Sequence, residues 1–362
     1  MAQADSSARI AMAMSGGVDS SVAALLLRRQ GAALVGISLH LTDVSGGGRC
    51  CSPRDFLDAR MVAEKLDFPY YVLNMEREFR AAVIEDFIRE YRSGRTPVPC
   101  AHCNTQVKFG DLLKRAELLG CDRVATGHYA RLSWDGAAGR TRLWRARDRE
   151  KDQSYFLFGL DDRQRDCALF PLGDLSKGAV RALAREAGLP VADKPESMDL
   201  CFLPHGGHGE LVARETGLDE EAAAGDFLDR DGKILGRHRG VHHYTVGQRR
   251  GLGISGSGPY YVVEIRASDN SVVLGTEQEQ LSRECHVPRP NWIGVLPPGA
   301  SLEALVQIRH RHPGGAATLH PDPGGGVRVR FRDPQRAIAP GQAAVFYRDD
   351  EVLGGGFIAA AH

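Results

Sequence analysis

Residues 10–21 read Ile-Ala-Met-Ala-Met-Ser-Gly-Gly-Val-Asp-Ser-Ser, and the organisation of the whole chain can be worked out from them. The largely apolar run 8–14 predicts a short buried strand, which the polar, glycine-rich run 15–20 cannot continue. Residues 22–29 predict a helix that Gly31 ends. A strand, a glycine loop and a helix in this order bring backbone N–H groups at a helix N-terminus to an anion. We therefore expect a phosphate-binding loop here.

The chemistry of this loop narrows the kind of phosphate that it binds. Gly16 and Gly17 let the backbone approach phosphate oxygens, and the three serines of the stretch add hydroxyl donors. The loop lacks the lysine of a G-x-x-x-x-G-K-S/T loop and the third glycine of a dinucleotide fingerprint. Asp19 suits a magnesium ion on a pyrophosphate leaving group. The simpler alternative is an ordinary turn between a strand and a helix, capped by serine.

Composition bounds the class of protein. A chain of 362 residues has room for two or three domains with hydrophobic cores. A hydrophobic content of 43% and a charged content of 25% are typical of a globular protein in water. The sequence contains no apolar run of membrane-spanning length and no charged-then-apolar N-terminus, so we expect a cytoplasmic protein that does not bind a membrane.

The charge balance argues against general binding of nucleic acid, because the formal net charge is zero. Basic residues are nevertheless concentrated in the segments 140–151, 230–250 and 309–336. Three basic segments on a neutral chain fit a partner that is held by phosphate contacts at several places. The alternative, which is the better one for any single segment, is a solvated strand face whose arginines pair with acidic residues.

Alternating strands and helices follow the glycine loop. The elements expected up to residue 126 are strands at 34–41, 70–73 and 123–126 and helices at 52–66, 76–91 and 104–119. The proline-rich stretch 95–103 is expected to be irregular. This alternation predicts an α/β fold with a Rossmann-like parallel sheet and helices on both faces. Ligands in such sheets bind beyond the carboxyl ends of the strands, where the glycine loop lies.

The pattern changes in the second half of the chain. Residues 131–145 predict a β-hairpin, and residues 176–187 predict a helix. We place a domain boundary near Pro204 and expect a short acidic helix at 218–224. From residue 260 onward, short strands separated by turns predict a small antiparallel β-barrel.

Cysteine spacing indicates a second reactive site. The eight cysteines are unevenly spaced and do not form the pattern of a secreted disulfide framework. Cys100 and Cys103 form a C-x-x-C pair before a predicted helix, whose positive end favours a nucleophilic thiolate, and Cys201 is distant in sequence. Three chemistries remain open: half of a zinc site, a persulfide thiol with a resolving thiol, and an iron–sulfur cluster held by three cysteines. We assign no role to the pair Cys50-Cys51.

Further motifs follow the glycine loop in a set order. They are T-P-x-P-x-x-x-C-N (96–104), ATGHY (125–129), KDQSYFL (151–157), KPES (194–197) before Cys201-Phe202, YTVGQR (244–249) and APGQ (339–342). The string SGGVDSS (15–21) resembles the PP-loop of ATP pyrophosphatases, which adenylate a substrate oxygen and release pyrophosphate. Together, over nearly the whole chain, the motifs resemble the tRNA-specific 2-thiouridylase family, called MnmA in bacteria.

The resemblance implies sulfur transfer to the wobble uridine of tRNAs for Lys, Glu and Gln. In the family, ATP adenylates the uridine 2-carbonyl oxygen and pyrophosphate leaves. A cysteine persulfide then supplies sulfur to the activated carbon, and AMP departs. Cys103 matches the family's nucleophile and Cys201 its persulfide cysteine, and these two residues can form a disulfide. The implied partners are tRNA and a sulfur donor, either a cysteine desulfurase or a sulfur-relay protein.

The resemblance also assigns binding residues and domains. The positions that it places at ATP are Ala13, Met14, Ser15, Gly16, Gly17, Val18, Asp19, Ser20, Leu39 and Gly127. The positions that it places at tRNA are Val98, Pro99 and Cys100 around the target base, and His128, Lys151, Asp152, Gln153, Arg309, His310 and Gln342. The expected domains are a PP-loop ATP-binding catalytic domain (1–204), a central tRNA-binding adaptor domain (205–284) and a C-terminal β-barrel (285–362).

One position departs from the family pattern and keeps alternatives open. Familiar members carry Asp three residues before the nucleophile, whereas this chain carries Cys100. A thiol there is a third soft ligand beside Cys103 and Cys201, so the alternative to the persulfide is an iron–sulfur cluster on these three residues. We retain the persulfide as the first interpretation, because soft ligands alone do not identify a metal. The remaining alternatives are another PP-loop tRNA-modifying ligase and a catalytically silent tRNA-binding protein.

Overall fold

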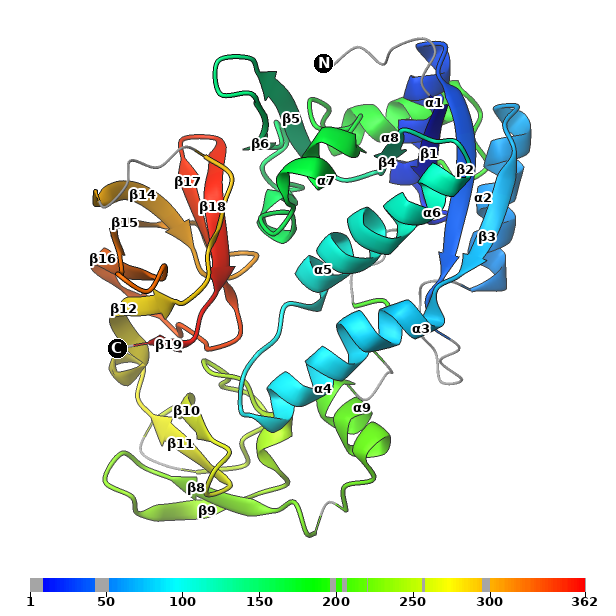
Figure 1. The fold of residues 1–362 in the computed structure, drawn as a ribbon. Helices are drawn as coiled ribbons and strands as arrows, with labels where there is room; N and C mark the ends of the chain where they lie inside the picture. The colour runs from blue at the N-terminus through cyan, green and yellow to red at the C-terminus, as the bar shows by residue number, and fades with distance from the viewer. Residues whose placement is uncertain are drawn as a thin grey trace.

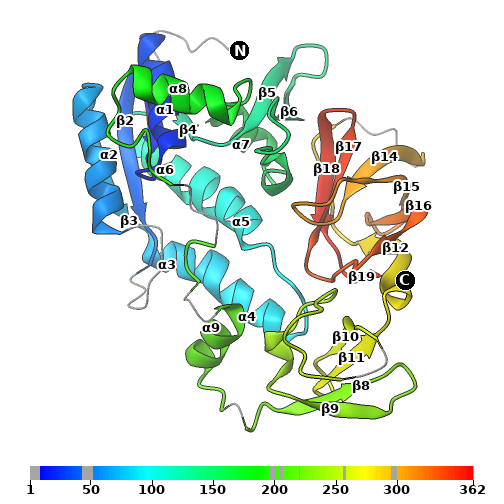
Figure 2. The same cartoon turned by 180° about the vertical axis from the view of Figure 1, so that it is seen from behind.

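The computed structural model describes residues 9–42, 52–195, 200–203, 207–219, 221–255, 258–294 and 300–361. The described strands form one parallel, one mixed and one antiparallel sheet (Figure 1). The parallel sheet and its helices make up one side of the molecule, and the other two sheets lie together on the opposite side (Figures 1 and 2). The pair Cys50-Cys51, the domain boundary at Pro204 and part of the 194–197 motif lie outside the described residues.

Strand β1 (Arg9–Ala13) is the centre of the parallel sheet, between β2 (Ala33–His40) and β4 (Arg123–Ala125). With β3 (Tyr70–Asn74) and β7 (Ala168–Leu169) at the edges, the strand order is β3-β2-β1-β4-β7, and every pair is parallel. The order changes direction at β1, and such a switch point is where open parallel sheets bind ligands. The predicted parallel sheet is therefore confirmed.

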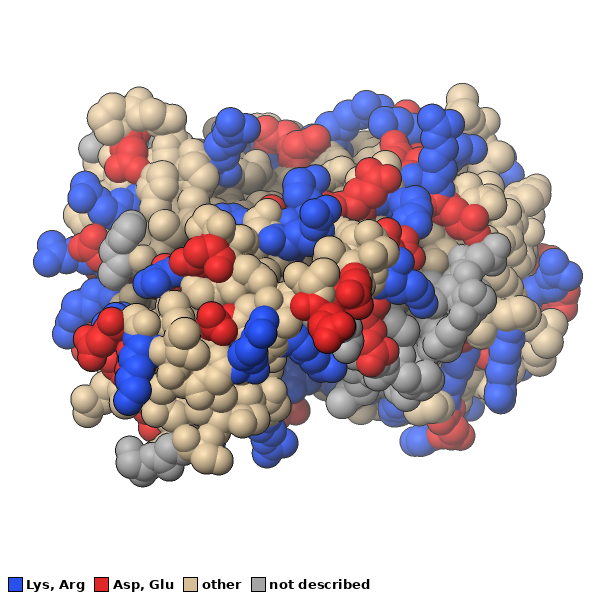
Figure 3. Space-filling model, turned by 90° about the horizontal axis from the view of Figure 1, so that it is seen from below, with Lys and Arg blue, Asp and Glu red and all other residues tan. Residues whose placement is uncertain are grey.

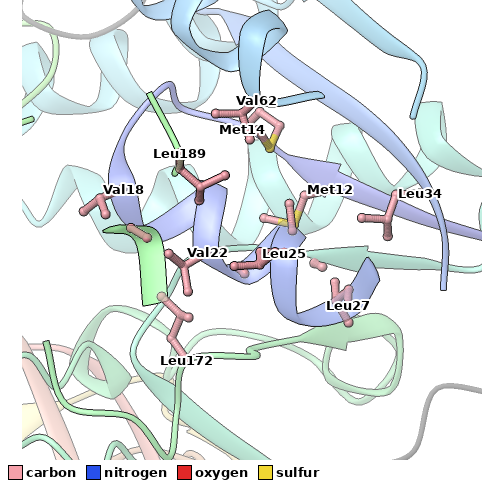
Figure 4. Close-up of a cluster of buried hydrophobic side chains, with 14 of the residues drawn as sticks. Met12, Met14, Val18, Val22, Leu25, Leu27, Leu34, Val62, Leu172 and Leu189 are labelled. Carbon is pink, nitrogen blue, oxygen red and sulfur yellow. The ribbon is translucent and has the colours of Figure 1, made fainter. Parts of the chain in front are cut away.

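Helices cover both faces of this sheet because alternate residues of β1 point to opposite sides. Ile10 and Met12 are fully buried in the core drawn in Figure 4, whereas Ala11 faces the core on the other side, beneath α6 (Leu112–Leu118). The helices that form the first core are α1 (Val18–Arg29), α2 (Pro53–Lys65) and α8 (Lys177–Glu186). Burial of each large aliphatic side chain contributes roughly 1.5–3 kcal/mol, so these two cores hold the loop end of β1 firmly.

The stretch 95–103 is only partly irregular, which corrects the sequence-based expectation. A continuous helical run begins at Pro99 with α5 (Pro99–His102) and continues through the π-helical segment η2 (Cys103–Asp111) into α6. Proline is well tolerated at the first position of a helix, because its missing N–H is not needed there. The helix therefore starts five residues before the predicted residue 104. Both cysteines of the C-x-x-C pair lie within it.

The long helix predicted at 76–91 is confirmed and also contains a π-helical turn. It consists of α3 (Glu76–Phe79), η1 (Arg80–Ile84) and α4 (Glu85–Arg92). Segments η1 and η2 contact each other, so the two helical runs pack side by side beneath the carboxyl ends of the sheet. The hydrophobic core between them includes Phe79, Phe87 and Cys103.

The middle of the chain forms a separate four-stranded sheet, in the order β10-β11-β8-β9. Its strands are β8 (Gly225–Leu228), β9 (Ile234–His238), β10 (Tyr261–Arg266) and β11 (Ser271–Gly275). The strands from residue 260 to 275 thus do not belong to the C-terminal barrel, because they pair with β8 instead. The acidic helix expected at 218–224 is also wrong. The helix of this region is α9 (Gly207–Thr216), and its glycines and histidine conceal it in the sequence.

The C-terminal strands form a larger antiparallel sheet that also takes in the predicted hairpin. That hairpin, β5 (Ala130–Asp135) and β6 (Arg140–Arg145), is confirmed, and Trp144 of β6 pairs with Glu351 of β18. The other strands of this sheet are β12 (Leu281–Val287), β13 (Asn291–Trp292), β14 (Leu302–Gln307), β15 (Gly315–Pro321), β16 (Val327–Arg336), β17 (Ala343–Arg348), β18 (Glu351–Phe357) and β19 (Ala360–Ala361). The hairpin at residues 130–145 and the C-terminal strands thus share one sheet.

Candidate active site

The glycine loop takes the anion-binding geometry, but α1 begins earlier than predicted. Gly17 is the N-cap, and the helix starts at Val18 instead of residue 22. The hydroxyls of Ser20 and Ser21 donate to the Gly17 carbonyl at 3.2 and 2.8 Å, and these bonds close the first turn. Gly16 has a φ of +71°, and any Cβ there would overlap the carbonyl of Asp55 on α2. Glycine is therefore required at that position.

A cavity of about 400 Å³ opens beyond the carboxyl ends of β1 and β2. It is lined by residues of the glycine loop, of the helical run from Pro99, of the turn after β4 and of the segment 200–203. The lining residues are Ala13, Met14, Ser15, Asp19, Ser20, Ile37, Leu39, Leu41, Asp55, Phe56, Phe79, Val83, Pro99, Cys100, Cys103, Asn104, Lys108, Thr126, Gly127, His128, Gln153, Phe156, Leu200, Cys201 and Phe202. Segments far apart in sequence thus face one space.

Most of the positions expected at ATP lie in this cavity. Those that line it are Ala13, Met14, Ser15, Asp19, Ser20, Leu39 and Gly127, whereas Gly16, Gly17 and Val18 are not among the lining residues. Gly127 touches α1 so closely that a Cβ would come within 2.7 Å of the Ser20 nitrogen. The turn after β4 and the first turn of α1 therefore form a single surface.

The carboxylate of Asp19 is hydrogen-bonded to two side chains of the protein in this structure. Both of its carboxylate oxygens accept from the Lys177 ammonium at 2.7 Å, and the Tyr129 hydroxyl donates to one of them at 2.8 Å. Nearby, Lys194 donates to the Gly16 carbonyl and to Asp55. The described residues include no group of three or more His, Cys, Asp or Glu side chains arranged for a metal. The magnesium role expected for Asp19 stays a prediction, because a metal carried by the nucleotide needs no such group.

The three candidate cysteines all line the cavity. Cys100 and Cys103 are three residues apart in the helical run, which places them on the same side of it, and Cys201 comes from the segment 200–203. Phe202 anchors that segment, since its ring packs edge-on against Phe79 and Phe87. The same search of the described residues finds no preformed three-cysteine group, and the iron–sulfur alternative stays a prediction.

His128 is a half-buried titratable group of the wall. Burial and the nearby Lys108 ammonium hold the pKa of His128 well below its usual value, so its ring is neutral near pH 7. Its Nδ1 lies 2.7 Å from the Thr126 hydroxyl, and its ring packs near Phe109 and Phe170. A neutral histidine here can accept or donate a hydrogen bond but brings no positive charge.

The positions expected at tRNA are divided between the cavity and its surroundings. Pro99, Cys100, His128 and Gln153 line the cavity, whereas Val98, Lys151, Asp152, Arg309, His310 and Gln342 do not. The His310 ring lies 4.5 Å from the ring of Phe156, which is part of the wall. Gln342 donates to the carbonyls of Thr96 and Pro97 at 3.2 and 3.3 Å, so it holds the segment that leads into the cysteine helix.

Asp152 and arginines of the basic segment 140–151 bond to other groups of the protein. Asp152 is buried, its pKa is raised by that burial, and it accepts from the Ala146 and Ser154 nitrogens. Arg142 bridges Asp135 and Glu351. The first basic segment therefore follows the simpler interpretation of paired arginines. On the face shown in Figure 3, basic and acidic side chains are likewise interspersed.

The sequence places Asn104 and Lys108 in the predicted helix 104–119 but marks neither as a residue of the site. Both line the cavity beside Cys103. Lys108 is five residues after Cys103, and in an α-helix that spacing points about 140° away. The π-helical geometry of η2 brings the two residues to the same wall, and no local sequence signal marks that geometry.

Comparison with known proteins gives a consistent result along the whole chain. Sequence-family models match as "tRNA methyl transferase HUP domain" over residues 8–205, "tRNA methyl transferase PRC-barrel domain" over 218–276 and "Aminomethyltransferase beta-barrel domain" over 282–358. A Trichormus variabilis protein named tRNA-specific 2-thiouridylase MnmA is 46% identical over 353 residues, which cover 97% of this chain and 98% of the relative. A Geobacter metallireducens protein of the same name is 46% identical over 361 residues, which cover 98% of this chain and 97% of the relative.

Some solved structures resemble part of the chain at low sequence identity. The U34-tRNA thiolase NcsA from Methanococcus maripaludis is 18% identical, with a TM-score of 0.36, over 59% of this chain and 66% of that one. Among the described residues, no helix is both long and apolar enough to cross a membrane.

The parallel sheet, the glycine loop and the cavity define an α/β protein of the nucleotide-binding kind, with thiols facing its binding site. Identities of 43–46% over nearly the full length of curated relatives identify it further. The chain belongs to the family of tRNA-specific 2-thiouridylases, MnmA.

Proposed function

We propose that the chain is a cytoplasmic, ATP-dependent sulfurtransferase that converts the wobble uridine of tRNAs for Lys, Glu and Gln into 2-thiouridine. The observation that carries this proposal is the single cavity shared by the glycine loop, Cys100, Cys103 and Cys201. The matching family models have methyl transferase in their descriptions. We follow the curated relatives, because thiols beside a nucleotide loop are what sulfur transfer requires.

The first step activates the uridine. The 2-carbonyl oxygen attacks the α-phosphorus of Mg–ATP, the O–P bond forms, and the bond to the β-phosphate breaks with release of pyrophosphate. The N3 proton leaves, so that a neutral O2-adenylyl uridine results. Gly16, Gly17 and the start of α1 supply the backbone donors for the phosphates. The target base must leave its stack to reach the cavity beside Val98, Pro99 and Cys100.

The second step replaces oxygen by sulfur. The terminal sulfur of a Cys201 persulfide attacks C2, the C2–O2 bond breaks, and AMP leaves with the electron pair. The Cys103 thiolate then attacks the Cys201 sulfur of the new C–S–S link. A Cys103–Cys201 disulfide forms, the uridine keeps the sulfur as a thiocarbonyl, and N3 regains its proton. A dithiol reductant restores both thiols, and a cysteine desulfurase or a sulfur-relay protein reloads Cys201.

The experiment uses the full-length chain with ATP, magnesium, a persulfide donor and tRNA transcripts that carry uridine at the wobble position. Nucleoside mass spectrometry measures 2-thiouridine, and a coupled assay measures pyrophosphate. We expect thiolation by the wild type, its loss in Cys103→Ser and Cys201→Ser, and its retention in the control Cys167→Ser, because Cys167 lies away from the cavity. Wild-type protein that forms no 2-thiouridine would overturn the proposal.

The same assay separates the alternatives. A silent tRNA-binding protein releases no pyrophosphate when tRNA is added, and another PP-loop ligase releases it but keeps its activity in both cysteine variants. A visible absorption spectrum of anaerobically purified protein, with iron and sulfide counted, tests the cluster. Brown protein that loses both colour and thiolation in Cys100→Ser would overturn the persulfide route. Colourless protein that thiolates tRNA, with Cys100→Ser tolerated, supports it.

A further inference from the structure

Lys108 lies in the wall of the cavity and has no part in the steps described above. Its side chain shares that wall with Cys103, Asn104 and His128. Of the described residues that line the cavity, Lys108 is the one lysine, and none is an arginine. It is therefore the source of permanent positive charge at the place where a nucleotide phosphate and the reacting uridine would meet.

The π-helical segment η2 explains why this lysine reaches the site. In a regular α-helix, residues five apart lie on clearly different faces. Hydrogen bonding from residue i to i+5, as in η2, widens the turn and brings Cys103 and Lys108 to the same side. Segments of this kind are rare and are frequently found at functional sites.

The ionic partners of the nearby lysines separate Lys108 from the others. Lys177 donates to both carboxylate oxygens of Asp19, and Lys194 donates to Asp55 and Asp58. The Lys108 ammonium instead donates to the amide oxygen of Asn104 at 3.1 Å, which is a neutral acceptor.

An ammonium has three N–H donors, and within the described part of the chain no carboxylate balances this one. Asn104 itself is fixed, since its amide donates to the Phe156 carbonyl at 3.1 Å. The lysine is thus oriented by a buried, held partner while its charge stays available to the cavity.

We propose that Lys108 is a catalytic residue that binds the α-phosphoryl oxygens of the adenylated uridine. This inference rests on the proposed function. When the O2–P bond forms, negative charge grows on those oxygens as pyrophosphate leaves. When the C2–O2 bond breaks, the same oxygens take the electron pair as AMP. An ammonium placed beside them lowers the energy of both transition states without gaining or losing a proton.

The test compares Lys108→Met, Lys108→Arg and Lys108→Ala with the control Lys114→Met. Lys114 lies farther along the same helical run, with a 71% exposed side chain that pairs with Asp111. Pyrophosphate release and 2-thiouridine formation are measured with saturating ATP and tRNA, and thermal melting checks the fold. We expect Lys108→Met to lower kcat by about 10²–10³ with little change in the KM for ATP, as for other electrostatic contacts to a transition state.

We expect the lower kcat of Lys108→Met to result from the missing positive charge and not from a change in the fold. Lys108→Arg should retain most of the activity, and added methylammonium should restore part of the activity of Lys108→Ala, whereas Lys114→Met behaves as the wild type. A Lys108→Met variant with wild-type kcat, or a loss that neither arginine nor methylammonium repairs, would overturn the assignment. If the wild type releases pyrophosphate with tRNA but makes no 2-thiouridine, the proposed function fails, and the pyrophosphate assay still decides the role of Lys108.

Discussion

Gly127 shows how a single missing side chain shapes the site. Its α-carbon lies against the first turn of α1, where a Cβ would come within 2.7 Å of the Ser20 nitrogen and 2.8 Å of the Asp19 carbonyl carbon. Backbone atoms cannot move aside as the end of a flexible side chain can. The two segments that would enclose the nucleotide are therefore in direct contact only because this residue is glycine.

We predict that Gly127→Ala separates these segments and lowers tRNA-dependent pyrophosphate release at least about tenfold, a cost of roughly 1.4 kcal/mol in the transition state. The matched control is Gly178→Ala in α8, where the nearest atom to a new Cβ is 3.9 Å away. That variant should melt at or above the wild-type temperature, because alanine favours a helix. Equal activity of the two variants would contradict the prediction.

Buried histidines make the stability of the fold depend on pH. Burial, reinforced by His242 and Arg239, lowers the pKa of His243 to about 4, and burial lowers that of His312 to about 4. In the unfolded chain, histidine titrates near pH ~6.5. Between these values the unfolded state binds more protons than the folded state, so the free energy of unfolding falls as the pH falls.

We therefore predict that the melting temperature drops between pH 7 and pH 5 and that His312→Asn reduces the drop. The substitution removes one group that must stay neutral in the fold. His320→Asn on β15, at a half-buried position, is the control for the chemistry of the substitution. A melting temperature that is independent of pH in the wild type would refute this account.

The helical run from Pro99 is the element on which the site depends, and it is held from outside by His102. The His102 ring stacks on Phe357 of β18 at 4.7 Å and 4°, and its Nε2 lies 3.3 Å from the Asp86 carboxylate on α4. His102 lies between the two cysteines in sequence but faces away from them. The side of the run that carries Cys100 and Cys103 is thereby fixed toward the cavity.

We predict that Phe357→Ala loosens this run although Phe357 does not line the cavity. Cys103 should be alkylated faster by iodoacetamide, and 2-thiouridine formation should slow more than pyrophosphate release, because sulfur transfer needs the thiol in place. Trp134→Ala, which removes a 62% exposed ring from the hairpin, is the control. Unchanged alkylation of Cys103 in Phe357→Ala would argue against the stack as a support.

A helix or strand could be predicted from the sequence where residues close together in the chain carry the signal for it. The parallel sheet and its helices follow from short-range signals such as the Ser52 capping box of α2, which is present in the structure. The start of α5 was concealed by its prolines, and η2 has no signature in the sequence. The pairing of β12 with β16 could not be predicted from the sequence, because these two strands are distant in the chain, whereas β15 and β16 are neighbours. Motifs located Cys103 and Cys201, whereas Lys108 required the coordinates.

On the scale of the whole molecule, the C-terminal sheet supports the catalytic half directly. Arg95 donates to the carbonyls of Ile358 and Ala359, and the Thr96 nitrogen donates to the Pro340 carbonyl at 2.8 Å. Together with Gln342, these bonds fasten the segment before the cysteine helix to the far end of the chain. The core under α6 also includes residues of β17 and β18, such as Val345 and Val352.

We predict that the fragment 1–204 does not fold into a stable unit, although it contains the glycine loop and all three candidate cysteines. It would expose the core residues that β17 and β18 cover and the free edge of the hairpin β5–β6. Circular dichroism melting and ATP binding of the fragment, measured beside the full chain, provide the test. A cooperative transition and wild-type ATP affinity in the fragment would show that the supporting contacts are dispensable.

The strand pairing between β6 and β18 also has a consequence for protein synthesis. A ribosome that has translated the first 204 residues has made the reactive thiols but not the strand that the hairpin needs. The support that β18 gives to the hairpin is therefore added only after residue 351 has been synthesised. A chain that stops before β18 lacks this pairing, and we expect its half-made hairpin edge to be bound by chaperones until synthesis continues.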